Sequence, residues 1–214
     1  MSKSFAILGL GRFGCRLTEA LHDIGAEILV ADNDEEKINR YSDIADTAIV
    51  ADLANEESVR ALGIEEMDVA VICMGESLES SIICAMVAGE LGVPKVLAKA
   101  SNKRMGDILT KIGVNEIIYP EEEAAFRTAK RLMSENFIDY YDLDENLCLI
   151  SMSPKEEWIG HSLSELNLRG KYSINVIAVK ENGGKFTQPD PKRSIGKSAQ
   201  MMVVAEKKNL KKLN

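Results

Sequence analysis

The feature that most constrains the fold of this chain is a glycine-rich stretch near its start, FAILGLGRFG at residues 5–14. A short apolar run precedes the glycines, and a helix-compatible segment follows them. Strand, tight turn and helix in this order are the context in which such a motif indicates a dinucleotide-binding turn. Gly9 permits the turn, Gly11 lets the backbone approach a pyrophosphate, and Gly14 lets helix and strand pack closely. The stretch predicts a bound nucleotide, and leaves open whether that nucleotide is a reagent or a signal.

Short β-like runs alternate with helix-like segments up to about residue 120. This alternation is typical of βαβ units around a parallel sheet. Some runs, such as 69–73, are apolar throughout, which suits strands that are covered on both faces. We therefore expect a doubly wound, Rossmann-like α/β domain with strands near residues 5–9, 27–31, 47–50, 68–73, 95–99 and 116–119.

A helical pattern begins at Glu121, directly after Tyr119-Pro120. Its first turn is acidic, and acidic side chains there are stabilised by the helix dipole. The apolar residues of this helix, predicted over 121–137, fall on one face: Phe126, Ala129, Leu132, Met133 and Phe137. That face needs a packing partner, and the pattern leaves open whether it is the chain's own sheet or another protomer.

A second, smaller domain is predicted after an acidic linker at 139–145. Turn signals at Asn182-Gly183-Gly184 and around Pro189 separate its short elements. The predicted division is a nucleotide-binding domain at 1–138, which includes the helix, the linker, and an α+β domain at 146–214. The expected elements of the last part are strands at 147–152, 174–180, 185–188 and 201–205 and a helix near 162–168.

Composition excludes several classes of protein. A nucleic-acid footprint would be a basic face or stripe, which the net charge of −8 does not support, so no nucleic-acid partner is expected. No segment reaches the roughly 18 to 20 uninterrupted apolar residues that span a bilayer, and no signal-peptide pattern is present; a cytoplasmic protein is expected. Four widely spaced cysteines and two histidines argue against a disulfide framework or a zinc site.

Asp32 is the strongest candidate outside the glycine turn. It ends the second predicted strand, 32 − 14 = 18 residues beyond Gly14, close to the spacing of a carboxylate that accepts a hydrogen bond from a ribose hydroxyl. The alternative is an exposed acid that caps the next helix, a position that Asn33 or Asp34 would fill equally well.

Further polar side chains follow the third, fourth and fifth predicted strands, whose carboxyl ends should line the same crevice. Asp52 is placed to face an adenine amino group and Lys99 a phosphate, although both are also typical of surface residues at strand ends. Arg12 could fold onto a terminal phosphate through paired hydrogen bonds, or remain a solvated first-turn arginine. The nucleotide-binding candidates are Gly9, Gly11, Arg12, Phe13, Gly14, Asp32, Asn33, Asp52 and Lys99.

The residues that an enzyme would need are missing from this pattern. A dehydrogenase requires a substrate domain and an acid or base beside the nicotinamide, but the second domain is small. His22 falls in the first predicted helix and His161 at a helix boundary. We therefore expect no catalytic residues and no enzyme activity. The alternative is a small NAD-dependent oxidoreductase, since Asp32 would favour NAD over NADP.

The sequence resembles the Ktr/Trk family of potassium-uptake regulators, and most closely its KtrA-like cytosolic subunits with RCK N and RCK C domains. The resemblance is carried by residues 5–14, by Asp32, by Ile118-Tyr119-Pro120-Glu121 and by the small C-terminal domain. It implies allosteric control by ATP and ADP, with NAD or NADH in some relatives. It also implies dimers, an octameric ring, and docking on the cytoplasmic face of a membrane potassium-translocating subunit of the KtrB or TrkH type.

The same resemblance implies individual roles. Arg12 would contact the γ-phosphate from a neighbouring protomer, and Glu121 would hold a magnesium or sodium ion beside the ATP phosphates. The helix at 121–137 would be a crossover helix that packs on the partner. In the C domain, cyclic di-AMP would bind at the positions Leu168, Arg169, Asn175, Val176 and Pro191.

Overall fold

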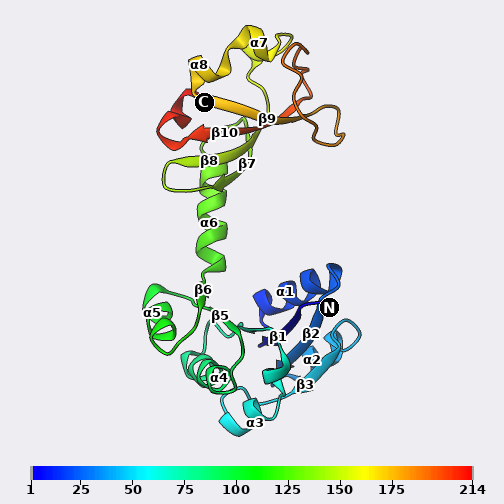
Figure 1. Ribbon diagram of the computed structural model, residues 1–214, viewed down its shortest axis with the longest axis vertical. Helices are drawn as coiled ribbons and strands as arrows, with labels where there is room; N and C mark the ends of the chain where they lie inside the picture. The colour runs from blue at the N-terminus through cyan, green and yellow to red at the C-terminus, as the bar shows by residue number, and fades with distance from the viewer. Residues whose placement is uncertain (1, 214) are drawn as a thin grey trace. The chain divides into compact units, whose positions relative to one another are not determined.

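The computed structural model describes residues 2–213, which divide into two compact units between Glu121 and Glu122. The first unit contains a parallel sheet in the order β3-β2-β1-β4-β5-β6 (Figure 1). Its strands are β1 (Ser4–Leu8), β2 (Glu27–Asp32), β3 (Thr47–Val50), β4 (Val69–Ile72), β5 (Lys95–Lys99) and β6 (Glu116–Ile118). Its helices are α1 (Arg12–Asp23), α2 (Glu35–Tyr41), α3 (Glu56–Arg60), α4 (Leu78–Glu90) and α5 (Lys103–Lys111).

Both faces of this sheet are covered, which explains its apolar strands. Leu8 and Ile72 belong to the core that includes residues of α3, α4 and α5. Their chain neighbours Ile7 and Val71 belong to the core that includes residues of α1 and α2. The predicted doubly wound α/β fold is thereby confirmed. Because β1 and β4 are adjacent at the centre, the strand order reverses there, and the carboxyl ends of these two strands open the crevice in which such sheets bind ligands.

The start of α1 differs from the starts of the other long helices of this unit. Ser77 and Asn102 cap α4 and α5, and each accepts a hydrogen bond from a backbone N–H in the first turn. The residue before α1 is Gly11, which has no side chain to do so, and the first turn of α1 carries no acidic residue. Free N–H groups therefore remain at the end of α1 that adjoins the crevice.

The helix predicted at 121–137 is shorter in the structure. Helix α6 runs from Pro120 to Arg131, and a turn closed by the hydrogen bond from Phe137 N to Ser134 O follows it. Phe137 is a buried strand residue rather than part of the helix face. The expected apolar stripe remains open to solvent, since Leu132 is 76% and Met133 65% exposed.

The second unit contains an antiparallel sheet in the order β7-β8-β10-β9. Its strands are β7 (Phe137–Asp142), β8 (Leu147–Met152), β9 (Ile174–Lys180) and β10 (Gln200–Glu206), and its short helices are α7 (Leu163–Leu166) and α8 (Leu168–Tyr172). Its core surrounds Trp158, whose ring makes an edge contact with the ring of Tyr172, with 5.1 Å between the two ring centroids. This is the small α+β unit that the sequence predicts.

Two details of this unit correct the prediction. The segment expected as a linker at 139–145 is mostly strand β7, which pairs with β8. The Asp144 carboxylate closes the hairpin by accepting hydrogen bonds from Asn146 N and Leu147 N, both at 2.6 Å. The strand expected at 185–188 is reduced to one bridge between Val179 and Thr187.

No helix among residues 2–213 combines the length and the apolar character that crossing a bilayer requires.

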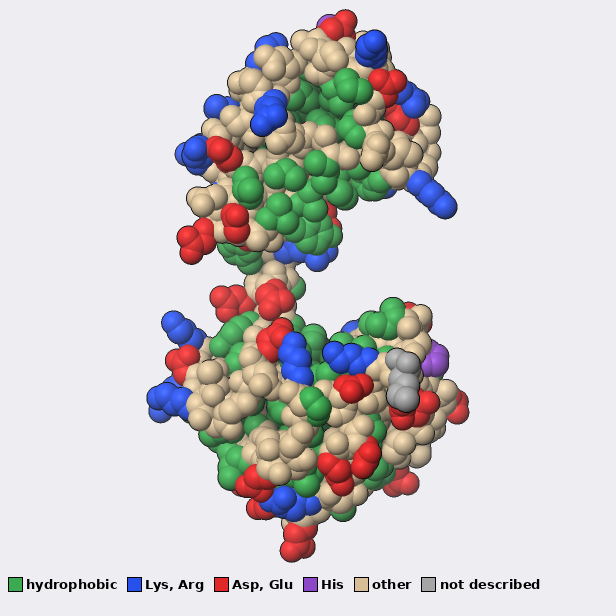
Figure 2. All heavy atoms as spheres, in the orientation of Figure 1, with side chains coloured by type: hydrophobic (Ala, Val, Ile, Leu, Met, Phe, Trp, Pro, Cys, Tyr) green, Lys and Arg blue, Asp and Glu red, His purple; other side chains and the backbone are tan. Residues whose placement is uncertain are grey.

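On the face seen in Figure 2, basic and acidic side chains are interspersed over each unit.

Candidate functional site

The glycine turn between β1 and α1 forms the floor of the candidate site. Gly9 has a φ of +100°, and a Cβ atom on it would lie 2.7 Å from Met74 Cγ. A Cβ atom on Gly14 would lie 2.1 Å from Gly9 O, so α1 packs directly on the turn. The nearest atom to an added Cβ on Gly11 is Cys73 O, at 4.0 Å. The turn is thus closed underneath and open at Gly11, as a cradle for a phosphate requires.

Asp32 holds this turn in place. It lies at the end of β2, is 6% exposed, and its Oδ2 accepts a hydrogen bond of 2.6 Å from Leu10 N. Its Oδ1 accepts hydrogen bonds from Asp34 N at 3.0 Å and from Lys37 Nζ at 3.3 Å. The neighbouring Asn33 is exposed. The carboxylate predicted to contact a ribose therefore also organises the backbone that would meet the pyrophosphate.

Three other predicted residues, Arg12, Phe13 and Asp52, differ in the contacts that their side chains make. Arg12 is the exposed first residue of α1, and in the described part of the chain it makes no hydrogen bond or ion pair. Phe13 is half-buried and packs on the core beneath α1. Asp52, which follows β3, is exposed, and its carboxylate accepts a hydrogen bond from Ala54 N at 2.9 Å. The Arg12 guanidinium is thus free to bind an anion, whereas Asp52 is partly used by its own turn.

Lys99 and Glu121 form an ion pair that the sequence did not predict. Lys99 ends β5, Glu121 lies in the first turn of α6, and Lys99 Nζ donates to Glu121 Oε1 at 2.7 Å. This hydrogen bond, followed by one from the backbone, lowers the pKa of the Glu121 carboxyl below its usual range. Within residues 2–213 no three His, Cys, Asp or Glu side chains are arranged to hold a metal ion. A cation at Glu121 would therefore need ligands from a bound nucleotide.

The residues predicted to bind cyclic di-AMP are spread over the second unit. Leu168 is buried and Arg169 exposed, both in α8, while Asn175 is exposed and Val176 half-buried on β9. Pro191 O accepts a hydrogen bond from Ser164 N at 2.9 Å. No hydrogen bond among the described residues joins these side chains to one another.

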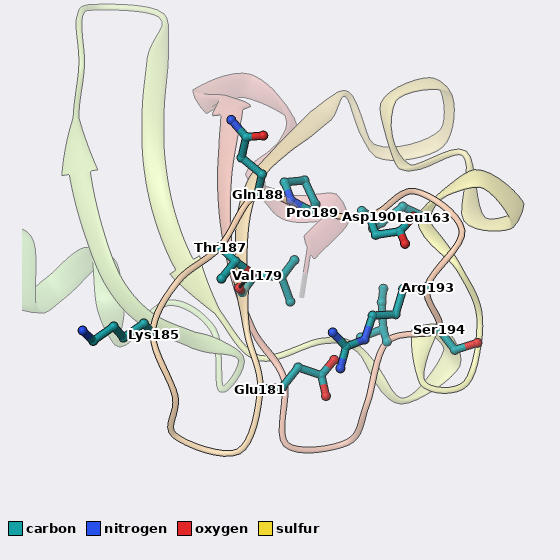
Figure 3. A pocket seen from close by; sticks show the side chains of 11 residues that line it. Leu163, Val179, Glu181, Lys185, Thr187, Gln188, Pro189, Asp190, Arg193 and Ser194 are labelled. Atoms are coloured by element: carbon teal, nitrogen blue, oxygen red, sulfur yellow. Dashed lines mark hydrogen bonds between the residues drawn. The ribbon is translucent and has the colours of Figure 1, made fainter.

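A cavity of about 240 Å³ lies beside Pro191. Figure 3 shows Arg193 and Glu181 pointing into it from the segments that join β9 to β10. Its apolar wall includes Leu163, Val179 and Ile195. None of the five residues predicted for cyclic di-AMP lines it.

Comparison with known proteins places both units in described families. The TrkA-N domain model matches residues 5–120, and the TrkA-C domain model matches residues 149–214. The chain is 35% identical over 189 residues to Ktr system potassium uptake protein C of Bacillus subtilis, which covers 88% of this chain and 86% of that protein. It is 31% identical over 211 residues to Ktr system potassium uptake protein A of the same organism, covering 99% and 95%.

A solved structure has a similar fold over nearly the whole chain. It is the GsuK channel bound to NAD, with a TM-score of 0.62 and 14% identity. The match covers 98% of this chain and 38% of the channel. At this identity the likeness concerns the fold.

Proposed function

Since the chain belongs to the TrkA family of potassium-uptake proteins, with a TrkA-N and a TrkA-C domain, we propose that it is the nucleotide-sensing regulatory subunit of a potassium uptake system. The observation that carries the proposal is the start of α1. An uncapped helix end without acidic residues follows a turn that is open at Gly11. Such an end binds anionic groups through its free N–H groups and its dipole.

The proposed ligands of the first unit are ATP and ADP, with NAD or NADH as the alternative. The pyrophosphate common to all four lies at Gly11 and the start of α1, and Asp32 receives the ribose hydroxyls. A magnesium or sodium ion beside the phosphates is held by Glu121. These assignments are supported by the free helix end, by the burial of Asp32 at the crevice, and by the contact of Lys99 at the end of β5 with Glu121 in the first turn of α6.

The nucleotide acts as a signal in this proposal. A ligand shifts a conformational equilibrium only through its different affinity for the two states, and ATP differs from ADP in its γ-phosphate. Arg12 from a neighbouring protomer reads this group, so that the arrangement of paired N domains follows the nucleotide. Of the two histidines, His22 is in the last turn of α1, at the opposite end of that helix from the glycine turn, and His161 belongs to the second unit.

The proposed assembly is a ring of eight chains built from dimers, which docks on the cytoplasmic side of a separate membrane potassium-translocating subunit. The exposed apolar side chains of α6 and the turn after it support self-association, because they include Phe126, Leu132 and Met133. The second unit takes cyclic di-AMP as a further ligand, at Arg169, Asn175 and the residues around them.

Calorimetric titration tests this function. We expect purified protein to bind ATP and ADP without hydrolysing them, and to bind cyclic di-AMP. Its molar mass from light scattering should be that of an octamer. Binding of NADH alone, to a monomer or dimer that reduces a carbonyl substrate, would instead support the oxidoreductase.

An Arg12→Ala variant tests how ATP is distinguished from ADP. We expect its affinity for ATP to fall on the order of tenfold, because a charge-assisted contact to phosphate is lost, while its affinity for ADP stays within about twofold. Isothermal titration with both nucleotides measures this. Arg16→Ala is the matched control, since Arg16 lies one turn later on α1 and pairs with Glu19 at 2.7 Å. Equal loss of both affinities in Arg12→Ala would make Arg12 a general nucleotide contact.

A further inference from the structure

The cavity of about 240 Å³ in the second unit lies between two segments that backbone hydrogen bonds hold in place. On one side, Val179 near the end of β9 and Thr187 exchange two backbone hydrogen bonds of 3.0 Å. On the other side, Ile195 N donates to His161 O at 2.9 Å, and Gly160 N donates to Ile195 O at 2.8 Å. The walls of the cavity are therefore built by the fold of this unit.

Two opposite charges face this cavity without pairing with each other. Arg193 and Glu181 both point into it (Figure 3), yet within residues 2–213 neither side chain forms an ion pair, and the Arg193 guanidinium donates no hydrogen bond. Glu181 is seated against Gly196, whose N–H donates to Glu181 Oε1 at 3.4 Å. Arg193 follows a turn in which its N–H donates to Asp190 O at 3.2 Å. Each charge is thus carried by a defined piece of backbone.

The other charged residues at the cavity leave these two groups unbalanced. The Asp190 carboxylate accepts a hydrogen bond from Lys192 N at 2.9 Å, so its own turn uses it. The side chain of Lys185 points away from the cavity in Figure 3. A guanidinium and a carboxylate therefore remain for a ligand, beside the apolar wall of the cavity.

We propose that this cavity binds a small zwitterion with an apolar side chain, namely an aliphatic α-amino acid. Its carboxylate pairs with Arg193 through charge-assisted hydrogen bonds, its ammonium group pairs with Glu181, and its side chain covers the wall formed by Leu163, Val179 and Ile195. A ligand with only a negative charge is repelled by Glu181, and a ligand with only a positive charge is repelled by Arg193.

The volume of the cavity suits a ligand of this size. It exceeds the roughly 150 Å³ of an apolar cavity that holds benzene, and it is smaller than the roughly 300 to 1,000 Å³ of sites for drug-sized ligands. The site is separate from the nucleotide crevice of the first unit and from the five residues predicted for cyclic di-AMP, none of which lines it.

Titration of the full chain with L-valine and L-leucine, followed by methyl NMR, tests the proposal. We expect a dissociation constant on the order of 1 mM or below, with shifts at the methyl groups of Val179 and Ile195. Arg193→Met and Glu181→Gln should each weaken binding on the order of tenfold, because each removes one charged partner. Lys192→Met is the matched control, since Lys192 adjoins Arg193 and does not line the cavity. No binding of either amino acid below about 10 mM, or equal affinity in all variants, would overturn the proposal.

Two analogues of leucine separate the two charges. 4-Methylpentanoate lacks the ammonium group, and 3-methylbutylamine lacks the carboxylate. The wild type should bind both on the order of tenfold more weakly than L-leucine. Glu181→Gln should narrow this difference for 4-methylpentanoate, and Arg193→Met should narrow it for 3-methylbutylamine, because the repelling charge is gone. If the wild type bound 4-methylpentanoate as tightly as L-leucine, the cavity would be an anion site and the assignment of a zwitterion would fail.

A Gly196→Ala variant moves the carboxylate without changing any charge. The added methyl group would lie 2.7 Å from Glu181 Oε2, so the carboxylate has to shift. The affinity for L-leucine should fall several-fold, while the affinity for 4-methylpentanoate should not fall. Wild-type affinity for L-leucine in this variant would contradict the contact between Glu181 and the ammonium group.

Discussion

A Gly14→Ala variant is expected to destabilise the first unit by about 3 kcal/mol or more and to abolish nucleotide binding. The added Cβ would lie 2.1 Å from Gly9 O and 3.3 Å from Cys73 Cβ. The first of these atoms belongs to the backbone, so it cannot rotate away as a side chain would. Either α1 moves off the sheet or the turn deforms, and both displace the N–H groups that would hold the phosphates. Urea denaturation followed by circular dichroism measures the loss.

Two other glycines serve as controls. An added Cβ on Gly89 in α4 meets no atom within 4 Å, so Gly89→Ala should be neutral or slightly stabilising. Gly11→Ala should leave stability almost unchanged, since its nearest contact is at 4.0 Å, yet it should reduce ATP affinity because the methyl group fills the opening of the turn. Wild-type stability and ATP binding in Gly14→Ala would mean that α1 does not pack on the turn in this way.

The first unit could be predicted from the sequence because its signals are local. Apolar runs such as 69–73, the glycine turn and the capping residues each favour the same element that the structure contains. The strand order is that of the doubly wound fold that the alternation of strands and helices predicts. Local preference and the overall fold agree along this part of the chain.

The prediction was wrong where two periodicities overlap. Phe126, Leu132 and Phe137 fit one helical face, but α6 ends at Arg131 and Phe137 begins a strand. Between them, the hydrogen bond from Phe137 N to Ser134 O closes a turn. The acidic residues of 139–142 suggested a linker, although Tyr140 is buried and aromatic residues favour strands. Pairing with β8, which lies later in the chain, decided between these readings.

The candidate site was predictable in its positions and not in its contacts. Because the carboxyl ends of parallel strands lie at one edge of the sheet, Asp32, Asp52 and Lys99 meet there for any side-chain conformation. The bond from Leu10 N to Asp32 and the pairing of Lys99 with Glu121 depend on side-chain placement over 22 residues in each case. Lys99 is much less exposed than Glu121, and no feature of the sequence predicts this difference.

An Asp32→Asn variant is expected to lose ATP affinity on the order of a hundredfold. The side-chain amide has one acceptor where the carboxylate has two, and both carboxylate oxygens are used. Oδ2 faces Leu10 N at 2.6 Å, and Oδ1 faces the amide of Asp34 and the ammonium group of Lys37. Whichever way the amide turns, its NH₂ group meets a donor at a site that is 6% exposed. The turn loses its anchor, and the ribose loses its charged acceptor.

The matched control for this substitution lies two residues further along. Asp34 caps α2 and accepts hydrogen bonds from Glu36 N and Lys37 N, and asparagine caps a helix about as well as aspartate. Asp34→Asn should therefore bind ATP like the wild type and unfold at nearly the same urea concentration. Calorimetric titration and urea denaturation of both variants measure the difference. If Asp32→Asn bound ATP as tightly as Asp34→Asn, the turn would be held by its glycines alone, and Asp32 would be one more helix-proximal acid rather than the residue that joins the fold of the turn to its ligand.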